Sequence, residues 1–140
     1  RLTFHDGHSD PLKWRHLPHS LSPSDFTADR IRTLVGRSGS ATVVLDSLSW
    51  ILARLPLPSV CHTLKDLSWG HKGAACPAIR IVALLHKDLH LPGVFLSVCH
   101  LADTLIDVEG KGDRDCVTIT HHGRTGRTVT SVSVWESLYR

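Results

Sequence analysis

The feature that most constrains this fold is a pair of short apolar runs separated by helical sequence. Residues 41–45 and 79–85 are both rich in β-branched and other apolar side chains, which is typical of strands covered on both faces of a sheet. Between them, 48–55 predicts one or two helical turns, and a second helix starts at Ser59 with its apolar residues on one face. Because parallel strands require a crossover connection, this order predicts a parallel pair.

The same alternation of strand and helix extends in both directions along the chain. Residues 2–4 are a short strand candidate, and a helix of about eleven residues capped by Ser24 or Asp25 ends at Gly36. After the second apolar run, 95–102 predicts a helix and 104–108 a further strand. The order predicts an α/β fold, with a mostly parallel sheet flanked by helices.

The last part of the chain has a different pattern. Residues 116–120 and 128–135 are β-branched or alternating, and 123–126 is a turn between them, which predicts an antiparallel β-hairpin. A parallel α/β core followed by such a hairpin is the architecture of RecA-like domains. With 140 residues and no internal repeat, residues 1–140 are interpreted as a single domain.

Composition excludes some functions and names no partner. Sixteen Lys and Arg residues against 13 Asp and Glu leave a net charge of only +3. The apolar runs are far shorter than the ~20 residues that a membrane-spanning helix needs, so no membrane partner is expected. Cys61-His62 and Cys99-His100 lack the ligand spacing typical of zinc sites, and no metal site is expected.

A carboxylate and a hydroxyl follow the first apolar run directly. Asp46 and Ser47 stand where nucleotide hydrolases hold magnesium, at the carboxyl end of a strand, although such an aspartate also often caps the next turn. A phosphate loop of the form GxxxxGK[ST] is missing. The glycine-rich stretches 36–39 and 123–128 lead into strands instead of helices, so we expect no nucleotide cofactor.

Two further groups of polar residues lie at element ends. His86 begins the stretch 86–90, which places two imidazoles, an amine and a carboxylate at the same sheet edge as Asp46. This stretch is either a phosphate sensor, a metal site or a polar loop at the rim of the sheet. The hairpin tip is basic and either contacts RNA phosphates or is charged for solubility. Its candidate RNA contacts are His121, His122, Arg124 and Arg127.

Two kinds of residue elsewhere in the chain bear on function. Trp14 lies in loop-like sequence, and exposed tryptophans are frequent anchors at protein interfaces. Ser47 and Ser49 have histidines near them, but the flanking glycines of a nucleophile elbow are missing.

Several short motifs resemble the Elongator complex protein 5 family. The most specific are LDSLSW at 45–50 and LLHKDLH at 84–90. The others are Arg1-Leu2, His5-Asp6, Asp10-Pro11-Leu12, Trp14 and Arg54-Leu55-Pro56. The hairpin from Gly110 onwards matches the family in pattern more than in letters.

The resemblance implies an accessory subunit and not an enzyme. Such a subunit is RecA-like, has lost its phosphate loop, and alternates with Elongator proteins 4 and 6 in a hexameric ring. The ring works with the catalytic Elongator subcomplex in the modification of tRNA wobble uridines, binds tRNA, and is cytoplasmic and nuclear. Asp46, Ser47 and His86 are then a degenerate remnant of a nucleotide site, and the chain is a fragment that lacks the N-terminal strand and the phosphate-loop region.

Two alternatives remain open at this level. One is a RecA-type ATPase in which Asp46 holds magnesium and His86 senses phosphate. The other is a freestanding RNA-binding domain that acts through Arg124 and Arg127.

Overall fold

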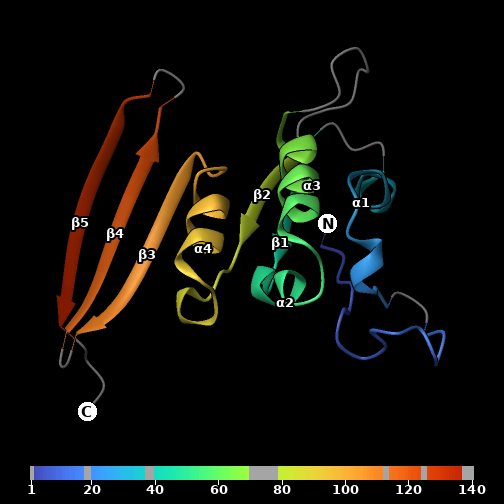
Figure 1. Cartoon of the computed structure of the whole chain (residues 1–140). Coiled ribbons are helices and arrows are strands. Elements are labelled where there is room, and N and C mark those ends of the chain that lie inside the picture. The colour runs from blue at the N-terminus through green and yellow to red at the C-terminus, as the bar shows by residue number, and fades with distance from the viewer. Residues whose placement is uncertain are drawn as a thin grey trace. The chain divides into compact units, whose positions relative to one another are not determined.

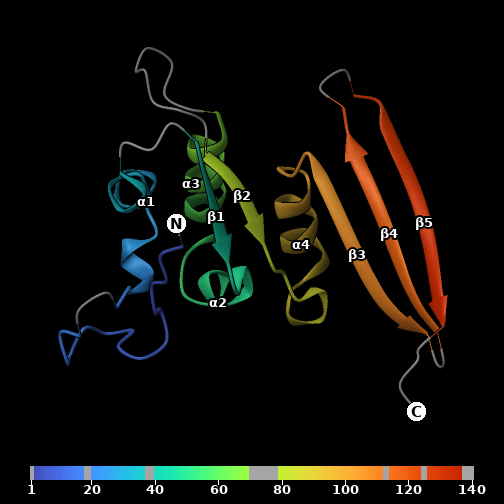
Figure 2. The same ribbon diagram turned by 180° about the vertical axis from the view of Figure 1, so that it is seen from behind.

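The computed structural model describes residues 2–17, 20–36, 40–69, 79–111, 114–123 and 126–136. They fall into two compact units, Arg1–Val94 and Phe95–Arg140, which are described separately (Figures 1 and 2). In chain order the elements are the 3-10 turn η1 (Pro23–Asp25), α1 (Ala28–Val35), β1 (Ala41–Leu45), α2 (Leu48–Leu52), α3 (Leu57–Trp69), β2 (Ile79–Ala83), the 3-10 turn η2 (Lys87–Leu89), α4 (Pro92–Cys99), β3 (Thr104–Lys111), β4 (Arg114–His122) and β5 (Thr128–Glu136).

The first unit is built on a pair of parallel strands. β1 pairs with β2 in a register that sets Ala41 opposite Ile79 and Leu45 opposite Ala83. The connection between them contains α2 and α3. The parallel pair and its helical crossover are therefore confirmed, and β1 has the bounds that the apolar run indicated.

One face of this strand pair is packed against helices. Ile31 of α1, Leu67 of α3 and Ile79 of β2 form a buried cluster, with exposed fractions of 7%, 1% and 5%. Figure 2 shows the two strands in front of α3, and Figure 1 shows α3 in front of them from the other side. The cluster is what holds the helices on the sheet, since apolar burial is the main favourable term in folding.

The opposite face of β1 and β2 is not packed within the described residues. Val44 and Val82 are 68% and 52% exposed, and burial alternates along β1. The expectation that these strands are covered on both faces is therefore wrong for this part of the chain. A continuous apolar run does not reveal which of the two faces finds a partner, because side chains alternate between them.

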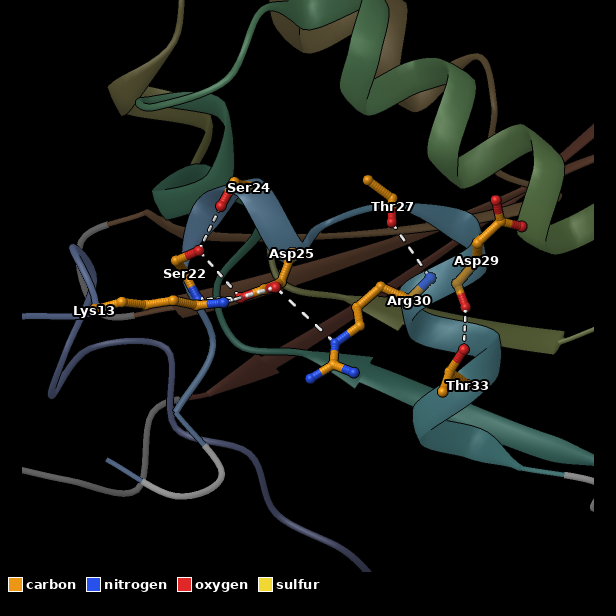
Figure 3. A network of polar contacts seen from close by, with 8 residues as sticks. All are labelled: Lys13, Ser22, Ser24, Asp25, Thr27, Asp29, Arg30 and Thr33. Atoms are coloured by element: carbon orange, nitrogen blue, oxygen red, sulfur yellow. Dashed lines mark hydrogen bonds and ion pairs between the residues drawn. The ribbon is translucent and has the colours of Figure 1, made fainter. Parts of the chain in front are cut away.

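The helix expected before β1 forms, with a later start. Thr27 caps α1 by accepting the N–H of Arg30 at 3.3 Å. Gly36 ends it with φ +72°, the left-handed region that favours glycine. The expected cap Asp25 instead accepts the Ser22 N–H at 2.8 Å and closes η1, as Figure 3 shows.

Two other expectations have different outcomes. Residues 2–4 form no strand, because no described strand pairs with them, and Leu2 and Phe4 are 95% and 82% exposed. The loop expected at 70–77 lies outside the described residues.

The second unit contains α4 from Phe95 onwards and an antiparallel sheet in the order β3-β4-β5. β4 and β5 form the predicted hairpin, which is confirmed. β3 pairs with β4 along its whole length, from Thr104 opposite His121 to Lys111 opposite Arg114, so it does not extend a parallel sheet as expected. The mixed α/β class is confirmed, with one parallel and one antiparallel sheet.

The helices of the described residues share one further property. None of them is long and apolar enough to cross a membrane.

Three buried or hydrogen-bonded carboxylates organise the segment before α1. Asp10 is only 4% exposed, and its carboxylate accepts the N–H groups of Arg15 and Leu17 at 3.1 and 3.4 Å. Burial raises the pKa of Asp10, but the hydrogen bonds from backbone N–H groups together lower it by more. The net shift of the pKa is therefore downward. Burial likewise raises the pKa of Asp25, and Lys13 and Ser22 lower it below its usual value. Hydrogen bonds from Ser9 and His8 lower the pKa of Asp6.

These lowered pKa values predict a loss of stability in acid. A carboxyl group with a lower pKa in the folded state stabilises the fold above its ordinary value of 3.8, and this contribution disappears as the pH falls through the folded value. We expect the urea midpoint of the chain to fall between about pH 5 and about pH 2. Asp25→Asn should lower the midpoint near neutral pH and flatten this dependence.

The matched control for this experiment is Asp29→Asn. The Asp29 side chain is 95% exposed and reaches Arg32 only at 3.9 Å. The Asp29→Asn substitution should leave both the urea midpoint and its dependence on pH close to those of the unchanged chain. An Asp25→Asn profile as steep as that of the unchanged chain would contradict the prediction.

Candidate functional site

The carboxyl ends of β1 and β2 bring polar residues from distant parts of the sequence together. Leu84 donates its N–H to the carbonyl of Leu45 at 3.0 Å, and Leu48 donates its N–H to the carbonyl of Leu84 at 2.8 Å. These bonds tie the residues that follow the two strands to one another. Asp46 and His86 therefore stand at one edge of the parallel sheet.

Asp46 and Ser47 connect β1 to α2. The Asp46 side chain is exposed and Ser47 is half-buried. Ser47 is the N-cap residue of α2, but its side chain makes no capping hydrogen bond. The peptide bond between them is cis. Within the described residues the Asp46 carboxylate makes no hydrogen bond that would cap the turn, and it is open to solvent.

Ser49 is the polar residue of this edge whose structural role the sequence motifs did not predict. Its side chain is 4% exposed, and its Oγ accepts the backbone N–H of His86 at 2.9 Å. The same Oγ lies 2.8 Å from Nε2 of His90. A serine within the otherwise apolar stretch 48–52 was the available signal, because a buried hydroxyl requires a hydrogen-bond partner.

The Ser49 contacts serve to position the loop after β2. The Ser49 hydroxyl fixes the backbone at His86, which is the N-cap of η2. The same buried hydroxyl has a second hydrogen-bond partner in the His90 ring. His86 itself is exposed, and His90 is half-buried. The arrangement can hold the exposed His86 side chain beside the Asp46 edge, while the Ser49 oxygen is too buried to meet a substrate.

Trp50 links α2 to the segment at the start of the chain. The Arg54 guanidinium lies 4.3 Å from the centroid of the Trp50 ring, and the His8 ring centroid lies 5.1 Å from it. Arg54 also donates to the Trp50 carbonyl at 3.1 Å. A cation over an aromatic face is a favourable arrangement. Together with Leu48 and Ile51, which are 2% and 8% exposed, these contacts give the stretch after Asp46 a packing role.

The basic hairpin tip belongs to the second unit. The Nδ1 atom of His121 lies 2.9 Å from the Thr104 hydroxyl, and Nδ1 of His122 lies 2.9 Å from the Ala102 carbonyl. A carbonyl only accepts, so His122 donates through Nδ1. Arg127 is exposed and accepts the Gly123 N–H at its carbonyl, at 2.8 Å. Arg124 lies outside the described residues.

The thiols and potential metal ligands are dispersed. Cys61, Cys99 and Cys116 are not in disulfides. Burial raises the pKa of Cys61, which makes its reactive thiolate scarcer. Within the described ranges, no three His, Cys, Asp or Glu side chains gather in a group that could hold a metal ion.

The fold and this edge define a mixed α/β protein in which a parallel strand pair presents Asp46 and His86 at its carboxyl ends. The sequence is 34% identical to Elongator complex protein 5 of Rattus norvegicus over 125 residues, which are 85% of this chain and 39% of that protein. For Elongator complex protein 5 of Danio rerio the identity is 37% over 134 residues, 92% of this chain and 43% of the relative. The human protein of the same name is 33% identical over 79% of this chain. The resemblance is therefore confirmed, and the matched segment is related to Elongator complex protein 5.

The relatives are much longer than this chain. It spans about two fifths of the length of the curated relatives it matches: 39% of the Rattus norvegicus protein and 43% of the Danio rerio protein. No family model and no solved structure matches the chain.

Proposed function

We propose that this chain is part of a non-catalytic, RecA-like subunit of the Elongator complex. The observation that carries the proposal is an identity of 33–37% to four proteins named Elongator complex protein 5, over most of this chain. The parallel strand pair with a helical crossover, and the antiparallel hairpin of β4 and β5, are compatible with a RecA-like architecture.

The geometry around Asp46 supports a structural role for the strand that carries it. The residues after Asp46 are occupied by internal contacts: Leu48 is 2% exposed, Ser49 holds the loop at His86, and Trp50 stacks with Arg54. Under this proposal Asp46, Ser47 and His86 are the remnant of a nucleotide site, retained at the sheet edge without a cofactor.

The proposed assembly is a hexameric ring with Elongator proteins 4 and 6, present in the cytoplasm and the nucleus. In this ring the subunit supports the catalytic Elongator subcomplex in modifying tRNA wobble uridines. The proposed tRNA contacts are at the hairpin tip, where His121 and Arg127 are both exposed. Cations on a protruding hairpin favour phosphate contacts, which depend on salt but not on sequence.

The proposal predicts a complex of defined composition. The full-length protein that contains this chain, co-expressed with Elongator proteins 4 and 6, should elute as one species that contains all three proteins in equal amounts. Size-exclusion chromatography with light scattering gives its mass. Separate elution of the three proteins would overturn the proposed function.

The same purified complex provides the tRNA and nucleotide measurements. Replacing Arg124 and Arg127 together with alanine should weaken tRNA binding and reduce its salt dependence, while the complex stays intact. Ser133→Ala, an exposed change farther along β5, opposite Val117, is the control. Asp46→Asn should leave any nucleotide turnover of the complex unchanged. A loss of turnover in this variant would favour the ATPase alternative.

A further inference from the structure

We propose that the loop of residues 10–17 and the groove beside it form a docking surface for a protein segment that carries an apolar side chain next to a carboxylate. The inference rests on the proposed function, because the partner is sought among the subunits of the same assembly. It adds a surface and a chemistry of recognition to that function.

The loop has a defined conformation before any partner binds. The buried Asp10 carboxylate accepts two backbone N–H groups, from Arg15 and Leu17, and the Asp10 carbonyl accepts the Lys13 N–H at 3.1 Å. Lys13 and His16 have φ values of +57° and +50°, which non-glycine residues adopt only when their surroundings require it. A loop that is already ordered loses less conformational entropy on binding.

This ordered loop holds large apolar side chains in solvent. Trp14 is 80% exposed and Leu12 is 64% exposed. Neither ring contact of Trp50, with His8 or with Arg54, involves Trp14, and an exposure of this size leaves most of the Trp14 ring open to solvent. Tryptophan is enriched among the residues that dominate binding energy at protein interfaces. An ordered loop with an exposed tryptophan therefore favours a role as an anchor.

A groove lies next to the loop and gives the partner a place to insert. It has a volume of about 570 Å³. Its apolar wall consists of Pro11, Leu12, Pro23 and Leu55. Arg54 borders it, held in place by the Trp50 ring, with Lys13 on the side of the loop. An apolar side chain fits such a wall, and a carboxylate fits the guanidinium at its border.

The charges around the loop favour a protein partner over RNA. The Lys13 ammonium is already paired with Asp25 at 2.8 Å, as Figure 3 shows, which leaves Arg15 and Arg54 as the cations of this surface. Nonspecific binding of nucleic acid uses several cations along a backbone path together with stacking faces. Trp14 could stack on a base, but the groove wall at Leu12 and Leu55 offers no face on which a base could stack. A mostly apolar surface with two cations instead matches an apolar segment that carries an acid.

The test uses the full-length protein in its complex with Elongator proteins 4 and 6. Trp14→Ala should weaken assembly by about tenfold or more, because hot-spot truncations have effects of this size or larger. Arg15→Glu should also weaken assembly, whereas Trp14→Phe should retain most of it. Leu89→Ala is the matched control, since Leu89 is 65% exposed and lies outside the loop. Circular dichroism and thermal unfolding check that each variant folds.

A photo-cross-linking residue at position 14 provides a second measurement that does not depend on a loss of binding. It should join the protein to one partner subunit, at a segment that contains apolar and acidic residues. Assembly that is equally strong in all variants, with no cross-link, would overturn the docking surface and leave the proposed function intact. No complex with the unchanged protein would overturn both. Intact assembly with weakened tRNA binding would assign the loop to RNA and overturn the proposal.

Discussion

Leu67→Ala should lower the free energy of unfolding by about 2–5 kcal/mol, the usual range for removing a buried leucine side chain. Leu67 is 1% exposed and lies in the cluster with Ile31 and Ile79, where α1, α3 and β2 meet. The truncation removes the apolar contacts of α3 with α1 and β2 and leaves a cavity between the three elements. Urea denaturation followed by circular dichroism measures the loss.

Leu96→Ala is the matched control for this experiment. Leu96 is also a helical leucine, in α4, but it is 53% exposed. Its truncation should cost clearly less than that of Leu67. A loss for Leu67→Ala no greater than that of the control would show that α3 is not packed on the strand pair in the way described.

Ser49→Ala should destabilise the chain by about 1–3 kcal/mol, because the backbone N–H of His86 loses its acceptor, the buried Ser49 hydroxyl. The His90 ring loses its contact with Oγ at the same time. The effect should be local: hydrogen exchange at the His86 amide should become faster than in the unchanged chain, while amides in the centre of β1 stay protected. This second readout separates a role in positioning the loop from a general loss of stability.

Ser68→Ala is the control for the serine substitution. Ser68, like Ser49, lies in a helix and bonds to a backbone group. It donates to the carbonyl of Leu64 at 3.0 Å, but it is exposed. Its replacement should change the unfolding free energy by no more than about 0.5 kcal/mol. Unchanged exchange at His86 in Ser49→Ala would contradict the proposed role of this hydroxyl.

Local patterns were sufficient for most element assignments. The β1 run was predicted with its observed bounds, and Val60, Leu64 and Leu67 share the buried face of α3, at 0%, 7% and 1% exposure. The hairpin followed from two β-branched runs around a glycine-containing turn. These features depend on neighbours within a few residues, so the sequence contains the necessary information.

Pairing between distant segments was less predictable. The run at 104–108 was expected to extend a parallel sheet, but β3 is antiparallel to β4. Residues 2–4 look like a strand and have no described strand beside them. The identity of a strand's neighbour depends on which edge it reaches in three dimensions, and periodicity along one segment contains no such information.

The sequence by itself determined that Asp46 and His86 follow two parallel strands, and thus that they stand at one edge, because the carboxyl ends of parallel strands meet there. Its motifs also determined the relationship to Elongator complex protein 5. Only the tertiary structure decided that Ser49 bonds to His86 and His90, that Trp50 stacks with Arg54, and that the Asp10 loop exposes Trp14. The physical reason is range: each strand or helix depends on consecutive residues, whereas these contacts depend on side chains that are brought together by the packing of several elements.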